Sequence, residues 1–218
     1  MQANMQGVAA VVLALAGALA APRAIAQQFE VGALGMISTY KSVGVAGAGS
    51  SGSVGPGFGP AGGFFVSQTL SGRWGGELRY IYFQNGLNLK SSGTEAEFGA
   101  RSHAIHYDLV YNFSDEDARY RPYVAAGFGL KYYQGTGTED PFQPLSHLAL
   151  LTKTSQALPA GDFGAGVKFR VGNRATIRVE FRDYVTAVPD RVIAGAPGSK
   201  VSGILHHWAP MFGISWVF

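Results

Sequence analysis

The chain has 218 residues, a formal net charge of +3, 31 glycines and no cysteine, and only 14% of its residues are charged. The absence of cysteine excludes a disulfide scaffold, a thiolate metal site and a cysteine nucleophile. The weak and scattered positive charge argues against nucleic acid as a partner, because that role needs a clustered basic face.

The first predicted element is a signal peptide over residues 1–26. An apolar run over residues 8–21 is followed by Ala24-Ile25-Ala26, a small-residue cleavage site. The run is shorter than the about 20 residues that a membrane-spanning helix needs. No Lys or Arg precedes it, so a buried first helix is the alternative. We expect cleavage after Ala26, export from the cytoplasm and a mature domain over residues 27–218.

The mature chain contains eight segments in which large apolar residues alternate with small or polar ones. A period of two residues is typical of a strand with two different faces. In chain order the predicted strands are Phe29–Tyr40, Ala61–Leu70, Trp74–Tyr82, His103–Phe113, Tyr123–Tyr132, Phe163–Val171, Ala175–Arg182 and a last strand from about Leu205.

The connections between these strands are alternately short and long. Short turns are predicted at Ser71-Gly72, Ser114–Arg119 and Gly172-Asn173, whereas the other connections span residues 41–60, 85–97, 134–161 and 186–203. Compact soluble domains rarely have loops longer than about 12–15 residues. Short turns at one end and long loops at the other are typical of membrane β-barrels. The predicted fold is therefore all-β: an eight-stranded antiparallel up-and-down transmembrane β-barrel.

The two faces of the strands can be assigned from their residues. The large aliphatic and aromatic face suits lipid, and the polar face, rich in glycine, suits the interior of a narrow barrel. A secreted lipocalin-type barrel would reverse the two faces, and the long loops argue against it. The charged residues predicted to form a lumen charge network are Glu77, Arg79, Asp108, Lys131, Lys168, Arg170, Arg178, Glu180 and Arg182.

This predicted network has six bases and three acids. Alternating charges in so narrow a barrel most often form a structural network of ion pairs that fills the interior. The excess of cations leaves a second interpretation open, a narrow channel that prefers anions.

The last strand, "HHWAPMFGISWVF", places Phe212, Ile214, Trp216 and Phe218 on one face. Together with "HAIHYDLVYNF", "RPYVAAGFGLKYY" and "DFGAGVKFRVGNRATIRVEFRDY", it resembles the small eight-stranded OmpA-like/OmpX-like outer-membrane β-barrel domains of Gram-negative bacteria. The resemblance implies an outer-membrane location, contact with outer-membrane lipids and lipopolysaccharide, and export through the periplasm to the outer-membrane assembly machinery. It also implies that these four residues are the assembly signal.

The same resemblance leaves the function open, because the family includes adhesins, membrane-stabilising proteins and modest channels. No peptidoglycan-binding domain follows Phe218, so anchoring to the cell wall is not implied. We expect a structural or surface-interaction role without enzymatic activity, and no cofactor.

Few residues suggest chemistry. Gly47–Gly52 matches G-x-G-x-x-G but is not followed by a segment able to form a helix, so a flexible loop is expected instead. The five histidines show no metal-ligand spacing on one face, and none is followed by Ser, either immediately or two residues further on. We therefore expect no metal site and no catalytic residue, although a lipid-modifying enzyme assembled from distant strands is a further alternative. Pro144–Leu158 is expected to form ordinary loop packing or a short helix.

Overall fold

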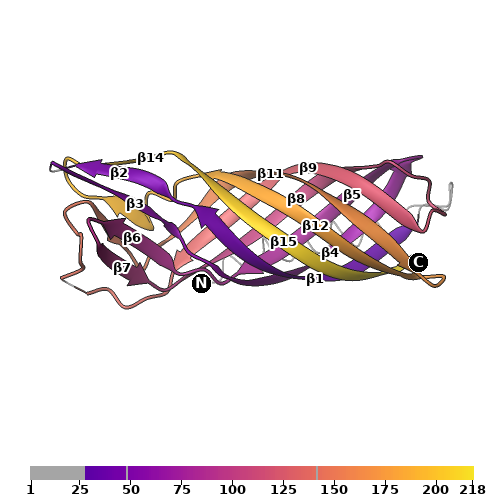
Figure 1. The fold of residues 1–218 in the computed structure, drawn as a ribbon, viewed down its shortest axis with the longest axis horizontal. Coiled ribbons are helices and arrows are strands. Elements are labelled where there is room, and N and C mark those ends of the chain that lie inside the picture. Colours follow the sequence, from indigo (N-terminus) through magenta and orange to yellow (C-terminus); the bar gives the residue numbers. More distant parts are fainter. Residues whose placement is uncertain (1–27, 48, 141) are drawn as a thin grey trace, which may run out of the picture.

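A computed structural model describes residues 28–47, 49–140 and 142–218 (Figure 1). The predicted signal peptide, residues 1–26, lies outside the described residues. Eight strands close into an antiparallel barrel in the order β1-β15-β12-β11-β9-β8-β5-β4. These strands are β1 (Phe29–Lys41), β4 (Gly59–Ser71), β5 (Trp74–Phe83), β8 (Ala100–Asn112), β9 (Tyr120–Gly135), β11 (Ser155–Val171), β12 (Ala175–Ala187) and β15 (Ile204–Val217).

The predicted strand order and the three short turns are confirmed. Each short turn joins two neighbours in the barrel, namely β4 with β5, β8 with β9, and β11 with β12. Pairing of β1 with β15 closes the barrel, and the backbone N–H of Phe218 donates to Phe29 O at 2.8 Å. The first described residues and the last residue therefore lie at the short-turn end. In the described part of the chain, we find no helix long and apolar enough to cross a membrane.

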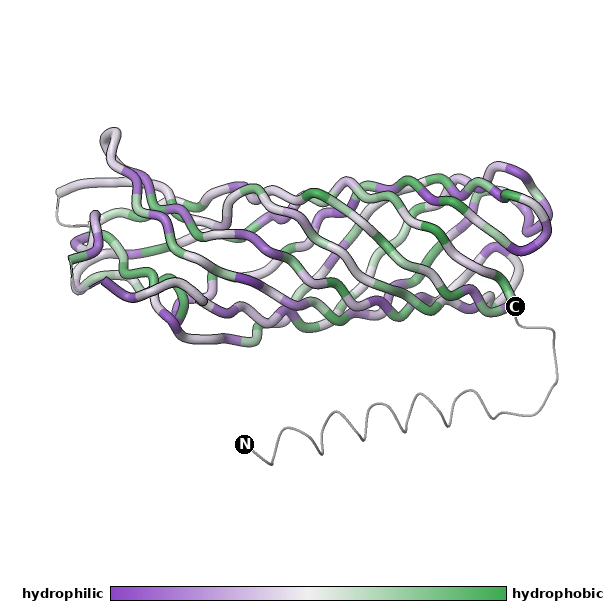
Figure 2. Tube along the Cα trace, turned by 90° about the horizontal axis from the view of Figure 1, so that it is seen from below, coloured by the Kyte–Doolittle hydropathy of each residue, from purple (hydrophilic) through white to green (hydrophobic). Residues whose placement is uncertain are grey.

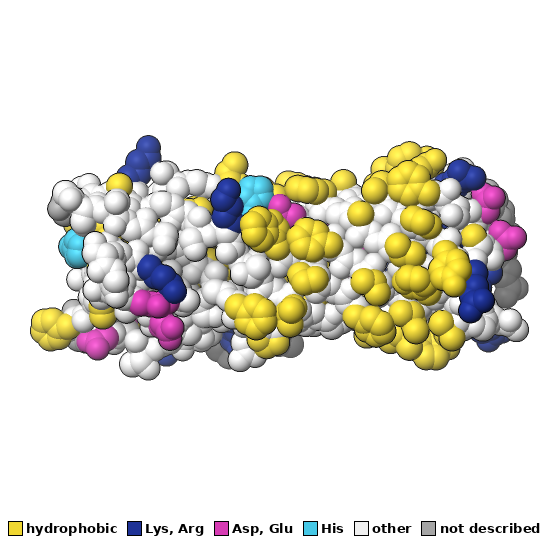
Figure 3. All heavy atoms as spheres, in the orientation of Figure 1, with side chains coloured by type: hydrophobic (Ala, Val, Ile, Leu, Met, Phe, Trp, Pro, Cys, Tyr) yellow, Lys and Arg dark blue, Asp and Glu magenta, His cyan; other side chains and the backbone are white. Residues whose placement is uncertain are grey.

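The predicted faces are also confirmed. On β12, Arg178, Glu180 and Arg182 point inward and are buried, whereas Val179 and Phe181 point outward and are exposed. Hydropathy alternates along the tilted strands in Figure 2. On the face seen in Figure 3, hydrophobic side chains cover much of the barrel wall. The wall therefore presents an apolar exterior, while its interior holds the charged side chains.

The long connections form an ordered extension of the barrel, which we call the loop cap. A five-stranded sheet has the order β14-β2-β3-β6-β7, and β10 pairs with β13 beside it. In Figure 1 this sheet lies at the end opposite the short turns. The cap strands are β2 (Val43–Gly47), β3 (Ser50–Pro56), β6 (Leu87–Ser91), β7 (Thr94–Phe98), β10 (Ala149–Leu151), β13 (Ile193–Gly195) and β14 (Lys200–Ser202).

The loop cap has an apolar core of its own. Val45, Val54, Leu89, Leu148 and Ile193 are at most 1% exposed and belong to one packed cluster, to which all four long connections contribute. Burial of this aliphatic surface is the main favourable term for ordering loops that contain so many glycines. The cap is therefore a folded unit and not a set of independent loops.

Two expectations for the loops are corrected by this arrangement. Gly47–Gly52 is not a flexible loop, because its described residues belong to the β2–β3 hairpin and its turn, where Gly49 has φ +76°. The helix suggested for Pro144–Leu158 is wrong. Its turns lead into β10, and Leu148 and Leu151 are buried in the cap core. The ordinary packing of this segment is confirmed.

Candidate functional site

The barrel interior holds a continuous network of ion pairs. Inward positions alternate along each strand, so neighbouring strands bring their charged residues to similar depths. An apolar cluster that includes Leu34, Phe65 and Ile81 packs in the same interior. The network consists of Glu30 on β1, Glu77 and Arg79 on β5, His106 and Asp108 on β8, Asp162 and Lys168 on β11, and Arg178, Glu180 and Arg182 on β12.

Two fully buried arginines form the middle of the network. Arg79 Nη1 donates to Glu180 Oε1 at 2.6 Å, and Arg178 Nη1 donates to Glu77 Oε2 at 2.8 Å. Arg79 also contacts Glu77, which therefore bridges both arginines. Tyr123 OH donates to Glu180 Oε2 at 2.5 Å. Buried charges with several charge-assisted partners are costly to separate, so these contacts fix the centre of the lumen.

Arg182 and His106 form the part of the network nearer the loop cap. Arg182 Nη1 lies 2.7 Å from Asp162 Oδ2 and 3.1 Å from Asp108 Oδ2. His106 Nδ1 lies 2.6 Å from Asp108 Oδ1 and 3.1 Å from Asp162 Oδ1. A Cβ at Gly127 would collide with Asp108 Oδ1 and approach Asp162 Oδ1 to 2.7 Å. Glycine at this position therefore makes room for the two carboxylates.

His106, Asp108 and Asp162 have the composition of a metal site. The distance of 2.6 Å between His106 Nδ1 and Asp108 Oδ1 is that of a hydrogen bond. Two ligand atoms that each lie about 2.0–2.2 Å from one zinc ion in tetrahedral geometry would be farther apart. The guanidinium of Arg182 already forms ion pairs with both carboxylates. The three residues are therefore arranged as an ion-pair cluster and not as a metal centre.

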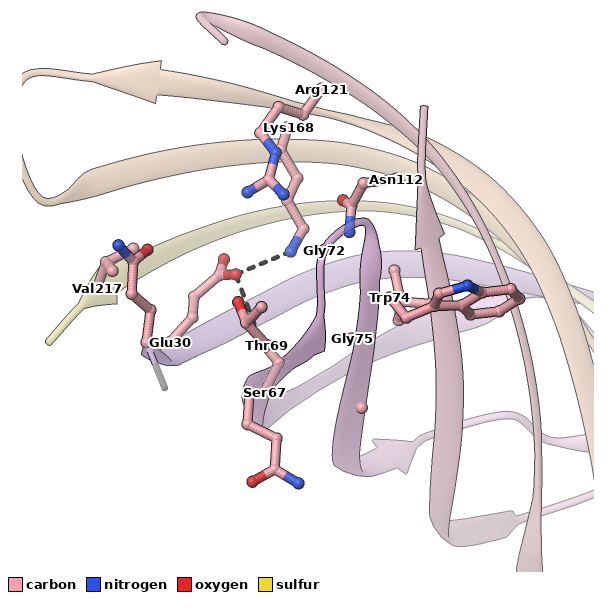
Figure 4. Close-up of a pocket in the computed structure, with 14 residues that line it drawn as sticks. Glu30, Ser67, Thr69, Gly72, Trp74, Gly75, Asn112, Arg121, Lys168 and Val217 are labelled. Atoms are coloured by element: carbon pink, nitrogen blue, oxygen red, sulfur yellow. Dashed lines mark hydrogen bonds and ion pairs between the residues drawn. The ribbon is translucent and has the colours of Figure 1, made fainter. Parts of the chain in front are cut away.

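The short-turn end of the network surrounds Glu30 (Figure 4). Its carboxylate accepts hydrogen bonds from Lys168 Nζ at 2.8 Å, Arg178 Nη2 at 2.9 Å and Ser215 Oγ at 2.5 Å. A cavity of about 40 Å³ lies beside it, and its lining includes Arg121 and Asn112. Glu30 therefore joins the lumen network to a small polar pocket at the barrel mouth.

Seven of the nine predicted network residues meet in the lumen: Glu77, Arg79, Asp108, Lys168, Arg178, Glu180 and Arg182. The structure adds Glu30, Asp162 and His106, which the sequence pattern missed. The network then has five carboxylates against four Lys or Arg side chains and one histidine. The predicted excess of six bases over three acids is therefore wrong for this network.

Arg170 and Lys131 do not join the network. Arg170 lies near the short-turn end of β11, where its guanidinium contacts the backbone carbonyls of Glu116 and Asp117 in the β8–β9 turn. Both residues have the inward parity, but parity gives the face of a strand and not the depth along the barrel axis.

Lys131 lies nearer the loop cap than the ion pairs. Its Nζ donates to His207 Nδ1 and lies 4.3 Å from the ring centroid of Phe83 and 4.9 Å from that of Tyr40. Tyr133 and Tyr184 complete this aromatic cage at 5.5 and 5.4 Å. The four rings surround the fully buried amino group at distances typical of cation–π contacts. Lys131 therefore separates the ion-pair network from the cap core.

A serine and a histidine meet in the loop cap, where Ser50 Oγ lies 3.2 Å from His147 Nε2. A triad also needs a carboxylate that orients the histidine. Within the described ranges, no Asp or Glu oxygen lies within 4.0 Å of the His147 ring. The pair therefore lacks the third member of a catalytic triad.

The apolar wall, the closed strand order and the charge-filled interior together define a small β-barrel of the membrane-spanning class. The sequence matches the outer membrane protein beta-barrel domain family over residues 9–196, and the chain belongs to that family. The protein is therefore located in the bacterial outer membrane. None of the curated proteins compared with this chain matches it.

Solved structures with a similar fold are outer-membrane barrels. Neisserial surface protein A is 12% identical, with a TM-score of 0.54 and coverage of 87% of this chain and 97% of that chain. The N-terminal barrel of Pseudomonas aeruginosa OprF is 15% identical, with a TM-score of 0.48 and coverage of 88% and 97%. Ail of Yersinia pestis is 11% identical, with a TM-score of 0.44 and coverage of 87% and 99%. At 12% identity, the similarity to Neisserial surface protein A supports the fold alone.

Proposed function

We propose that this protein is a closed, non-enzymatic outer-membrane barrel with a structural or surface-interaction role. The long connections of outer-membrane barrels are extracellular and their short turns are periplasmic. The loop cap would then be the part that meets the surroundings of the cell. The observation that carries this proposal is the apolar core of the cap, because a rigid cap can present a fixed surface.

The outward face of the cap sheet is small and polar. Ser53 on β3 is opposite Lys90 on β6, and Lys90 forms an exposed ion pair of 2.7 Å with Glu95 on β7. Such a face is soluble in water while its reverse side packs against the cap core. Its polar groups suit recognition by hydrogen bonds.

Three layers along the barrel axis favour a plugged lumen and argue against the narrow anion channel. The ion-pair network is followed by the caged Lys131 and then by the cap core, which includes Leu89 and Ile193. Charge balance within the network also weakens the reason to expect anion selectivity. An anion would have to cross both a fixed salt-bridge layer and an apolar layer.

The barrel exterior supports lipids and lipopolysaccharide as partners. Lys41 and Arg101 are exposed near the cap end of the wall, and the outward-facing Trp208 on β15 pairs with Thr39, two residues before Lys41 on β1. Cations and aromatic rings at this level suit the phosphate-bearing headgroups of lipopolysaccharide. At the opposite end, the outward-facing Phe212, Ile214, Trp216 and Phe218 remain our proposed signal for the assembly machinery.

Three experiments test the proposal. The chain has no cysteine, so Ser53→Cys and Ser114→Cys each supply one labelling site, on the cap sheet and on a short turn. A membrane-impermeant maleimide should label Ser53→Cys in intact cells and Ser114→Cys only after permeabilisation. The reverse pattern would contradict the proposed orientation.

Planar-bilayer recording tests the closed lumen. We expect no discrete conductance from the purified barrel. An anion-selective conductance that Arg178→Ala alters would support the channel instead.

Deletion of the gene should change surface attachment or detergent sensitivity of the cells, and complementation by the wild-type gene should restore either property.

A further inference from the structure

Three cations occupy one row across adjacent strands at the short-turn end of the lumen. Lys168 on β11 is the direct partner of Arg121 on β9 and of Arg178 on β12. All three share the inward parity of their strands, and Arg121 and Lys168 line the cavity shown in Figure 4. Like charges directly opposite one another on neighbouring strands are destabilising unless an anion compensates them.

The compensation within the chain is incomplete. Glu30 contacts Lys168 and Arg178, and Glu77 contacts Arg178 from the other side. The described residues include every Asp and Glu of the chain. Among them, no carboxylate oxygen lies within 4.0 Å of the guanidinium of Arg121. Arg121 is therefore a cation in a crowded row without an ion-pair partner of its own.

The cavity beside this row also has unused polar atoms. Arg121 Nε is a buried donor without a hydrogen-bond partner among the described residues. Asn112 Oδ1 is a buried acceptor that likewise has no hydrogen-bond partner among them. Asn112 is 5% exposed and lines the cavity with Arg121. The volume of about 40 Å³ has room for about three water molecules or for one small oxyanion.

We propose that this pocket binds a phosphate group that approaches from the short-turn end. A guanidinium beside an ammonium is a strong donor set for a tetrahedral oxyanion. The unused acceptor Asn112 Oδ1 needs a donor, which hydrogen phosphate has, a phosphate monoester has in its singly protonated form, and a phosphodiester lacks. The expected ligand is therefore a soluble hydrogen phosphate or monoester. The other source of a phosphate group is an anionic phospholipid headgroup, whose phosphodiester would bind the cations and leave Asn112 Oδ1 without a P–OH donor.

Titration calorimetry of the full barrel with inorganic phosphate tests the site, in an uncharged sugar detergent and at constant ionic strength. We expect binding that Arg121→Gln weakens by roughly tenfold or more, because one charge-assisted contact is lost. Arg121→Lys keeps the charge and should lie between the two. The matched control is Arg174→Gln, an exposed arginine of the β11–β12 turn outside the cavity lining, which should bind as the wild type does.

A second test uses a substitution that should stabilise the barrel. It depends on the same cations, Arg121 and Lys168. Without phosphate, Asn112→Asp should raise the unfolding midpoint because it supplies the missing anion beside Arg121, and it should also abolish phosphate binding. Phosphate should raise the midpoint of the wild type by mass action and leave that of Asn112→Asp unchanged. Heat-modifiable mobility on a gel identifies the variants that fold.

Nanodiscs separate the two sources of phosphate. If phosphatidylglycerol discs block phosphate binding and phosphatidylcholine discs do not, the site belongs to an anionic lipid headgroup. If neither blocks it, the ligand is soluble. Absence of binding to the folded wild type, or equal binding by wild type and Arg121→Gln, would overturn the proposal.

Discussion

The barrel interior and the loop cap lie along one axis, and both contain fully buried side chains, yet the chemistry of these side chains is opposite. Arg79, Arg178 and Arg182 are fully buried in the lumen, whereas the cap core is made of side chains such as Val54 and Leu148. The difference follows from what surrounds each region. A wall that is apolar towards lipid leaves its polar face inside, and a sheet that faces water leaves its apolar face inside.

The comparison also predicts which kind of substitution destabilises each region. An ion-pair network loses stability mainly when one partner is removed and the other stays buried. An apolar core loses stability in proportion to the volume removed. The following changes are ordered from the largest expected effect to the smallest.

Arg178→Met should cause the largest loss, because Glu30 and Glu77 would both lose a buried cation. Breaking a buried ion pair on one side costs about 3–5 kcal/mol. The free energy of unfolding, measured by urea titration of the refolded barrel in detergent, should fall by that amount. Arg73→Met removes an exposed ion pair with Asp115 and should change little. Equal losses from both variants would contradict the importance of the lumen network.

Leu148→Ala should act on the cap alone. Leu148 is fully buried in the cap core, and a buried Leu→Ala change costs about 2–5 kcal/mol. We expect faster proteolysis and hydrogen exchange in the cap strands, while the heat-modifiable gel shift of the barrel persists. Leu150, two residues further on in β10, is 40% exposed, so Leu150→Ala is the matched control. Loss of the gel shift in Leu148→Ala would mean that the two regions unfold as one.

Gly127→Ala tests how tightly the lumen network is packed. Its Cβ would collide with Asp108 Oδ1, and overpacking costs about 1–3 kcal/mol. At Gly161, on the paired strand, the nearest atom to an added Cβ is 3.9 Å away, so Gly161→Ala should be close to neutral. Urea titration of both variants gives the difference, and similar stabilities would indicate that the carboxylates can move aside.

Deletion of Phe218 should have the smallest effect on the purified barrel, since no contact of the lumen or of the cap core is lost. Its side chain is 76% exposed on the outer wall. If this residue belongs to the assembly signal, folded protein in cells should fall strongly, while refolding in detergent stays near normal. Equal amounts of wild type and deletion variant in cell membranes would reduce Phe218 to an ordinary lipid-facing residue.

The barrel could be predicted from the sequence because the two-residue period is strong where one face meets lipid. The pattern Arg178-Val179-Glu180-Phe181-Arg182 fixes both the strand and its faces. Strand ends were harder to predict, because the alternation suggests a strand from Phe163 whereas β11 begins at Ser155. Asp162 was missed for that reason.

Other parts of the site depend on contacts that no local pattern contains. Glu30 lies in a predicted strand, but the inward residues that follow it on that strand, Leu34 and Met36, are apolar. The depth of Lys131 and Arg170 depends on the register between strands. In the cap, the alternation of Val43 and Val45 is diluted by glycine and serine, so packing between distant loops decides the structure.

If the loop cap faces the outside of the cell, as we propose, its shared core also limits how that surface can vary over evolutionary time. In separate surface loops, each loop could drift or lengthen without regard to the others. Here a change at Val54, Leu89 or Ile193 would disturb segments from the other connections as well. Outward positions such as Ser53 and Lys90 carry no such constraint. Antigenic change is therefore expected at alternate residues of the cap strands, while the residues between them stay fixed.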